Sequence, residues 1–196
     1  WLTDFLSFTL VRLTGGRSTP STNTIVQPEY DDMRFPGITN HICCMQISEE
    51  PVRSDSDFNE LIKRIDLGLD AAIERVMTAR PDHLILGISA ESIWGGGLAA
   101  ARNISNRIKR LAPGTPFTQA AEALPAALKA YGVKGRIGVL TPYFPIAEKH
   151  VCQFVEEIGY EVAGTRHLSR PGPVEIAHTT EDALRKAINE LNSLHC

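Results

Sequence analysis

Short apolar segments alternate with amphipathic segments of helix length along most of this chain, and this alternation limits the possible folds more than any other feature. Strand-like runs are expected at residues 8–13, 39–47, 83–88, 117–119, 135–140 and 160–168. Helix-like segments are expected at residues 57–79, 95–111, 120–132, 146–159 and 179–195. Strands that alternate with helices of this length predict an α/β fold built from β-α-β units, with parallel sheets flanked by helices.

The segment at residues 57–79 shows the clearest helical period. Its apolar side chains recur at steps of three and four residues, which places them on one face: Leu61, Ile65, Leu69, Ala72, Ile73 and Val76. Ser54 or Asp55 is a suitable N-cap, and Pro81 prevents the helix from continuing. A long helix packed on a sheet is therefore expected here.

The length of 196 residues allows one sizeable core or two small lobes that share a hinge. The segment "APGTP" at residues 112–116 is the clearest break, so a first lobe at 1–112 and a second at 113–196 are expected. Residues 1–17 give weak fold signals. The helix at 179–195 has no strand after it, so a second lobe without its last strand and helix is expected.

Composition excludes several classes of protein. Hydrophobic residues make up 43% of the chain and charged residues 22%, which is ordinary for a globular protein. The net charge of −3 and the lack of a long basic stretch argue against a nucleic-acid partner. No apolar run reaches the roughly 20 residues that a membrane span needs. The four cysteines show no zinc-binding spacing, so no metal is expected, and reduced thiols in a cytoplasmic protein are the simplest interpretation.

Three polar segments follow expected strands, where parallel α/β sheets bind their ligands. The first, at 18–24, contains Pro20, Ser21 and Asn23, and the asparagine offers both a donor and an acceptor. An ordinary loop that caps a helix is the alternative interpretation. The glycine run at 95–97 fits neither a Walker loop nor a dinucleotide-binding motif, so nucleotide binding is not expected.

The other two segments carry the candidate catalytic hydroxyls. In residues 87–97, Ser89 follows Gly87 and Ile88 directly after an apolar strand, and its hydroxyl can hold a carboxylate; a helix-capping serine is the alternative. In residues 141–144, Thr141 is expected to cap a helix, and Tyr143 to present its phenol at the positive end of that helix. A surface tyrosine packed on a proline is the alternative.

These three segments together resemble the aspartate/glutamate racemase superfamily, and within it the branch of maleate cis-trans isomerases and arylmalonate decarboxylases. "PSTNT" (20–24) is similar to the first loop of that branch, and "DHLILGISAES" (82–92) falls where the family has its first catalytic position. "GVLTPYFPIAEKHVCQFVEEIGYEV" (138–162) is similar to the signature of the second lobe and is the most specific part. The resemblance extends over residues 18–195.

The resemblance implies two similar α/β lobes that face each other across a cleft, and chemistry without metal or organic cofactor. It implies a small dicarboxylate substrate and an enediolate held by a ring of hydrogen-bond donors. Tyr143 and Ser89 are the expected catalytic residues. Pro20, Ser21, Asn23, Gly87, Ile88 and Thr141 are expected to bind substrate. A homo-oligomer is compatible with this interpretation.

Gly87 stands where the resemblance places a first catalytic cysteine, as in the decarboxylases, and the position of the second falls beyond residue 196. The sequence therefore favours a cofactor-independent isomerase or lyase acting on a small dicarboxylate. The alternative is a non-catalytic carboxylate-binding domain or a truncated, inactive homologue.

Overall fold

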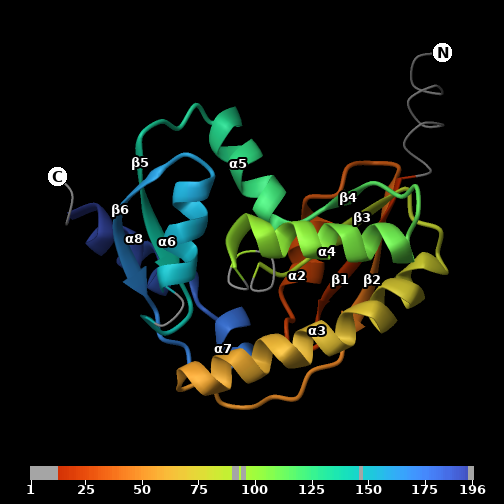
Figure 1. The fold of residues 1–196 in the computed structure, drawn as a ribbon, viewed down its shortest axis with the longest axis horizontal. Helices are drawn as coiled ribbons and strands as arrows, with labels where there is room; N and C mark the ends of the chain where they lie inside the picture. Colours follow the sequence, from red (N-terminus) through yellow and green to blue (C-terminus); the bar gives the residue numbers. More distant parts are fainter. Residues whose placement is uncertain (1–12, 90–92, 94–95, 146–147, 194–196) are drawn as a thin grey trace.

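The structure is a computed structural model that describes residues 13–89, 93, 96–145 and 148–193. A four-stranded parallel sheet has the order β2-β1-β3-β4. It contains β1 (Leu13–Pro20), β2 (Ile38–Met45), β3 (His83–Leu86) and β4 (Phe117–Thr118), with α2 (Val26–Asp32), α3 (Asp55–Met77) and α4 (Gly97–Leu111) around it. Figure 1 shows this sheet and its helices on one side of the molecule.

A second parallel sheet pairs β5 (Arg136–Thr141) with β6 (Glu161–His167). The helices of this part are α5 (Ala120–Ala130), α6 (Glu148–Glu157), α7 (Pro173–Ala177) and α8 (Glu181–Ser193). The predicted α/β architecture, with parallel sheets flanked by helices, is confirmed (Figure 1). The division after residue 112 stays a prediction, and β4, which follows it, pairs with β3 of the first sheet. None of the described helices is long and apolar enough to cross a membrane.

The first strand differs from the prediction. It occupies Leu13–Pro20, whereas a strand at 8–13 was expected; residues 8–12 of that segment lie outside the described residues. A Cβ atom on Gly16 would lie 2.7 Å from a methyl carbon of Leu84 and 2.9 Å from side-chain carbons of Val76 and Pro81. A glycine at position 16 therefore lets β1 lie between β2 and β3, where any larger side chain would clash with these neighbours.

Helix α3 follows the prediction closely. The Ser54 hydroxyl accepts from the Asp57 N–H at 3.2 Å, and the Asp57 carboxylate accepts from the Ser54 N–H at 3.1 Å, which makes a capping box. All six apolar residues of the predicted face are buried: Leu61, Ile65, Leu69, Ala72, Ile73 and Val76. They belong to the hydrophobic core, and the helix packs against β1 and β2.

The two sheets are joined by contacts between α4 and α6. The Glu157 carboxylate at the end of α6 accepts a hydrogen bond from the Leu98 N–H in the first turn of α4, at 2.7 Å. Gly97 has a φ of +63°, and a Cβ there would collide with the Glu157 carboxylate. This bond lowers the pKa of Glu157, because the backbone donor favours the ionised carboxylate.

We expect Glu157→Gln to lower the melting temperature at neutral pH. Because the pKa of Glu157 is lower in the folded chain, its contribution is present above the ordinary value of 4.5 and disappears as the pH falls through the folded pKa. Melts of the variant and the unaltered protein, followed by circular dichroism, should therefore converge in acid. Glu156→Gln, at the exposed neighbouring position, is the control. A difference that stays constant from neutral pH into acid would contradict this role.

Candidate functional site

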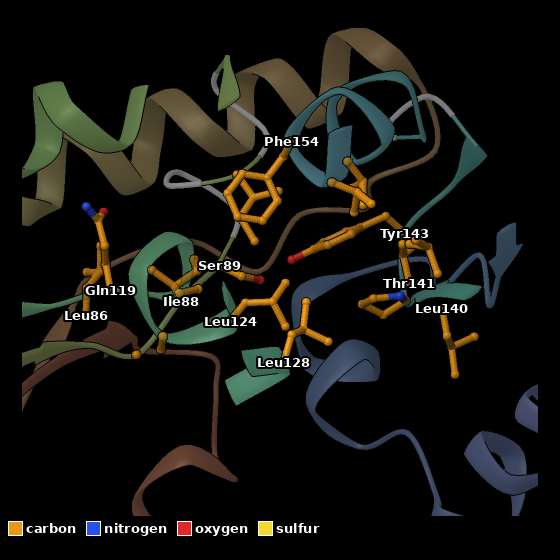
Figure 2. Close-up of a pocket in the computed structure, with 18 of the residues that line it drawn as sticks. Leu86, Ile88, Ser89, Gln119, Leu124, Leu128, Leu140, Thr141, Tyr143 and Phe154 are labelled. Carbon is orange, nitrogen blue, oxygen red and sulfur yellow. The ribbon is translucent and has the colours of Figure 1, made fainter. Parts of the chain in front are cut away.

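A cavity of about 980 Å³ lies between the two sheets, with lining residues from both. Its walls are mostly apolar side chains from β3, α5, β5 and α6, and Figure 2 shows Leu86, Ile88, Leu124, Leu128, Leu140 and Phe154 around it. Among the described residues, no Asp, Glu, Lys, Arg or His lines this cavity. Any polar group bound here therefore meets neutral hydrogen-bonding partners and apolar surface.

Tyr143 and Ser89 meet across this cavity, one from each side. Figure 2 shows the Tyr143 hydroxyl directed toward the Ser89 side chain, and the two side chains are hydrogen-bonded. Burial raises the pKa of Tyr143 to about 12, although the bond to Ser89 opposes this shift. The phenol therefore stays protonated at neutral pH and keeps its capacity to donate a hydrogen bond.

Backbone hydrogen bonds fix the main chain at Tyr143, and a helix that packs on the other sheet contacts its ring. The segments that follow β5 and β6 are joined by hydrogen bonds from the Ser169 N–H to the Tyr143 carbonyl at 3.3 Å and from the Arg170 N–H to the Pro142 carbonyl at 2.9 Å. The edge of one ring meets the face of the other where Phe58 on α3 contacts Tyr143, with centroids 5.5 Å apart. Such contacts fix a side chain in one orientation.

Gly87 follows β3, and its backbone is hydrogen-bonded to β1. Its N–H donates to the Ser18 carbonyl at 2.7 Å, and its carbonyl accepts from the Thr19 hydroxyl at 3.2 Å. Both backbone groups are thus used within the sheet, so Gly87 lines the cavity without offering its own donor to a ligand. A Cβ at this position would lie 3.2 Å from a methyl carbon of Val26.

The first polar segment contributes less to the cavity than expected. Asn23 lines it, but its side-chain oxygen already accepts from the Ile25 and Val26 N–H groups at the start of α2. This leaves the Asn23 amide nitrogen as its donor. Pro20, the last residue of β1, and Ser21 are not among the lining residues. The Ser21 hydroxyl instead accepts from the Ile47 N–H at 3.1 Å and ties the ends of β1 and β2 together.

The expected helix-capping role of Thr141 is wrong. Thr141 is the last residue of β5, it is buried, and α6 begins at Glu148. The Thr141 hydroxyl is instead 3.0 Å from Nδ1 of His167, its partner in the β5–β6 register. On the other side of the ring, Nε2 of His167 lies 3.3 Å from the Glu148 carboxylate. Thr141 also lines the cavity, so this chain of side chains ends at the candidate site.

None of the cysteines that the structure describes lines the cavity. Cys43 and Cys44 both lie in β2; Cys43 packs against the core, and Cys44 is exposed. Burial raises the pKa of Cys43 and of Cys152 on α6, which keeps these thiols protonated. The described residues also contain no group of three or more metal-ligating side chains.

Sequence reasoning missed His167 and Phe58. His167 ends a parallel strand, in the segment "GTRHL", and the rule that placed Ser89 and Tyr143 at strand ends applies to it equally. Phe58 gave no such signal, because its contact with Tyr143 depends on how α3 is placed relative to the second sheet.

Comparisons with known proteins agree with this geometry. No family model matches the chain. A maleate isomerase of Alcaligenes faecalis is 22% identical over 192 residues, which cover 90% of this chain and 71% of that protein. A Nocardia farcinica maleate cis-trans isomerase mutant has a similar structure, with a TM-score of 0.77 and 17% identity over 91% of this chain and 72% of that one. Arylmalonate decarboxylase has a TM-score of 0.66 and 16% identity, over 92% and 71% of the two chains.

At these identities the structural likeness establishes the fold. The sequence match to a maleate isomerase extends over most of the chain. Together these findings confirm the predicted resemblance: this chain has the fold of the maleate isomerases and of arylmalonate decarboxylase, and its sequence is similar to that of a maleate isomerase.

Proposed function

We propose that the chain binds a small dicarboxylate in the cavity between its sheets and is a cofactor-independent isomerase or decarboxylase that acts through a stabilised enediolate. The observation that carries this proposal is the convergence of Tyr143, Ser89 and Thr141, from two sheets, on one uncharged cavity. Hydroxyl groups at fixed positions can donate to a carboxylate and to the oxygens of an enediolate.

Neutral donors suit this chemistry better than a fixed positive charge alone. Charge grows on the oxygens as the carbanion forms, and donors already in place stabilise that charge without reorganisation; one such donor is typically worth about 3 kcal/mol. Tyr143 meets this need, because its raised pKa keeps it protonated and its ring is held by Phe58. We assign Tyr143 and Ser89 to the enediolate oxygens, and Asn23 and Thr141 to the carboxylate.

The walls of the cavity favour one kind of substrate. They are largely aliphatic, and a substrate made only of two carboxylates leaves that surface unused. A malonate that carries an aryl or alkyl substituent places its carboxylates at the hydroxyls and its substituent on the apolar wall. Arylmalonate decarboxylase, whose fold this chain has, is named for such substrates. This supports decarboxylation of a substituted malonate as the preferred reaction.

A second candidate function is carboxylate binding without turnover. The Nocardia farcinica isomerase mutant carries a covalently bound succinylcysteine intermediate, so a thiol reacts in that protein. In this chain no cysteine among the described residues lines the cavity. For this candidate, the described residues would supply recognition of a carboxylate without a reacting thiol.

Calorimetric titration with malonate, phenylmalonate and maleate, together with turnover assays by proton NMR, tests both candidates. Burial of a phenyl ring stabilises a complex by roughly 2 kcal/mol, so phenylmalonate is expected to bind about thirtyfold more tightly than malonate. Release of phenylacetate would support the decarboxylase, and formation of fumarate from maleate the isomerase. Binding without product would support the second candidate. Absence of binding by all three compounds would refute the proposed function.

A further inference from the structure

The side chains of Thr141, His167 and Glu148 form a continuous chain from the cavity to the surface of α6. Oγ1 of Thr141 and Nδ1 of His167 are 3.0 Å apart, and Nε2 of His167 is 3.3 Å from a Glu148 oxygen. The other Glu148 oxygen accepts from the Thr165 hydroxyl at 2.8 Å. Thr141 is 3% exposed and the His167 side chain 11%, so the two share a largely dry environment.

This arrangement fixes the direction of each hydrogen bond when the imidazole is neutral. An ionised carboxylate only accepts hydrogen bonds, so the ring proton lies on Nε2, next to Glu148. Nδ1 then carries a lone pair and accepts the Thr141 proton. The threonine oxygen can offer only lone pairs to the cavity in this state, and lone pairs repel a carboxylate.

Protonation of the imidazole reverses the bond between Thr141 and His167. Both ring nitrogens of a histidinium are donors, so Nδ1 donates to Oγ1 of Thr141. The hydroxyl proton of Thr141 is then no longer donated to Nδ1 of His167, and it can be donated to an anion in the cavity. The added positive charge on the ring attracts the same anion.

The charged groups that pack around His167 permit this change. From α6, Glu148 faces the ring, with a carboxylate oxygen 3.3 Å from Nε2. α8 packs on the opposite face of β6, where Arg166 pairs with Glu190 at 2.9 Å. From β5, the neutral Thr141 faces the ring. The carboxylate of Glu148 is therefore the charge in direct contact with His167.

We propose that His167 is a positioning residue whose protonation turns Thr141 from an acceptor into a donor, so that an anion entering the cavity draws a proton onto His167. This inference rests on the proposed function, because it concerns the same carboxylate site. By linkage, if binding takes up a proton, affinity for a carboxylate increases as the pH falls, and one coupled proton changes affinity by at most about tenfold per pH unit.

Phenylacetate is a suitable probe, because it carries one carboxylate and a phenyl ring and stays fully ionised from about pH 6 to about pH 8. Calorimetric titrations in PIPES and in imidazole buffer, whose ionisation enthalpies differ, measure the protons taken up on binding. The unaltered protein is expected to take up a proton and to bind more weakly at the higher pH. His167→Asn, whose amide can donate near the Nδ1 position without titrating, is expected to bind with no proton uptake and a flat pH profile.

His178→Asn is the matched control. His178 also pairs with a threonine hydroxyl, that of Thr24 at 3.1 Å, but neither residue lines the cavity. This variant is expected to keep the proton uptake. Nitrogen-15 NMR of the unaltered protein gives a second measurement: His167 should pass from a neutral ring protonated on Nε2 to a doubly protonated ring when phenylacetate is added.

The outcomes separate the two proposals. Binding of phenylacetate with equal heats in both buffers, or with an unchanged His167 imidazole, would overturn the role of His167 and leave the proposed function standing. Binding whose proton uptake persists in His167→Asn would also overturn it. A protein that binds neither phenylacetate nor any of malonate, phenylmalonate and maleate would overturn both. Proton uptake that disappears in His167→Asn and persists in His178→Asn would support the inference.

Discussion

Tyr143→Phe is expected to lower kcat/KM for the substrate at least about tenfold, which corresponds to roughly 1.4 kcal/mol of transition-state stabilisation. The variant keeps the ring, and with it the contact with Phe58, but removes the hydroxyl that meets Ser89 in the cavity. If the phenol donates to an oxygen that gains charge during the reaction, the loss should approach the roughly 3 kcal/mol typical of such a donor. Steady-state kinetics with phenylmalonate, or with the substrate that the assays identify, measure the effect.

Whether kcat or KM changes shows whether the Tyr143 hydroxyl acts in the transition state or only in binding. A donor that acts mainly in the transition state lowers kcat, whereas one that only binds the ground state raises KM with kcat unchanged. Tyr131→Phe is the control, because Tyr131 is 87% exposed and outside the cavity. If Tyr143→Phe has the activity of this control, Tyr143 is a wall of the cavity and has no part in the chemistry.

The sequence predicted most of the helices and strands of this chain because their signals are local. The apolar face of α3 repeats at helical steps, and Ser54 precedes it as a cap, so both features were predicted and are confirmed. The short helices α2 and α7 were missed. Helix α2 buries none of its side chains and therefore has no apolar period, and α7 has only five residues.

The features that were predicted wrongly depend on the surroundings of a residue. Residues 1–17 gave weak fold signals, but β1 runs through Gly16, which leaves room for Leu84 and Val76. Thr141 before a proline suggests a helix cap, but β5 continues through it and pairs it with His167. Neither close packing nor strand register can be deduced from the residues next in sequence.

The candidate site was predictable in position and not in detail. Because parallel strands end at one edge of a sheet, Ser89 and Tyr143 were both expected near the ligand, and both line the same cavity. Their hydrogen bond depends on how the two sheets face each other, which no local pattern encodes. Their catalytic roles stay predictions until the kinetic measurements are made.

Phe154→Ala is expected to destabilise the folded chain by about 3–5 kcal/mol, the usual cost of removing a buried aromatic ring. Phe154 is fully buried on α6, where it packs in the core and forms part of the cavity wall. For a chain of this length, a loss of that size lowers the melting temperature by roughly 10 °C. Thermal melts followed by circular dichroism measure the change.

Phe35→Ala is the matched control, because the same atoms are removed from a side chain that is 70% exposed. It should change stability by no more than about 0.5 kcal/mol. The comparison tests whether the second sheet and α6 pack as a core around the cavity, since only a packed wall makes the loss of a ring costly. If the two variants have the same melting temperature, α6 does not close the cavity. Packing of α6 then does not fix the distance between Tyr143 and Ser89.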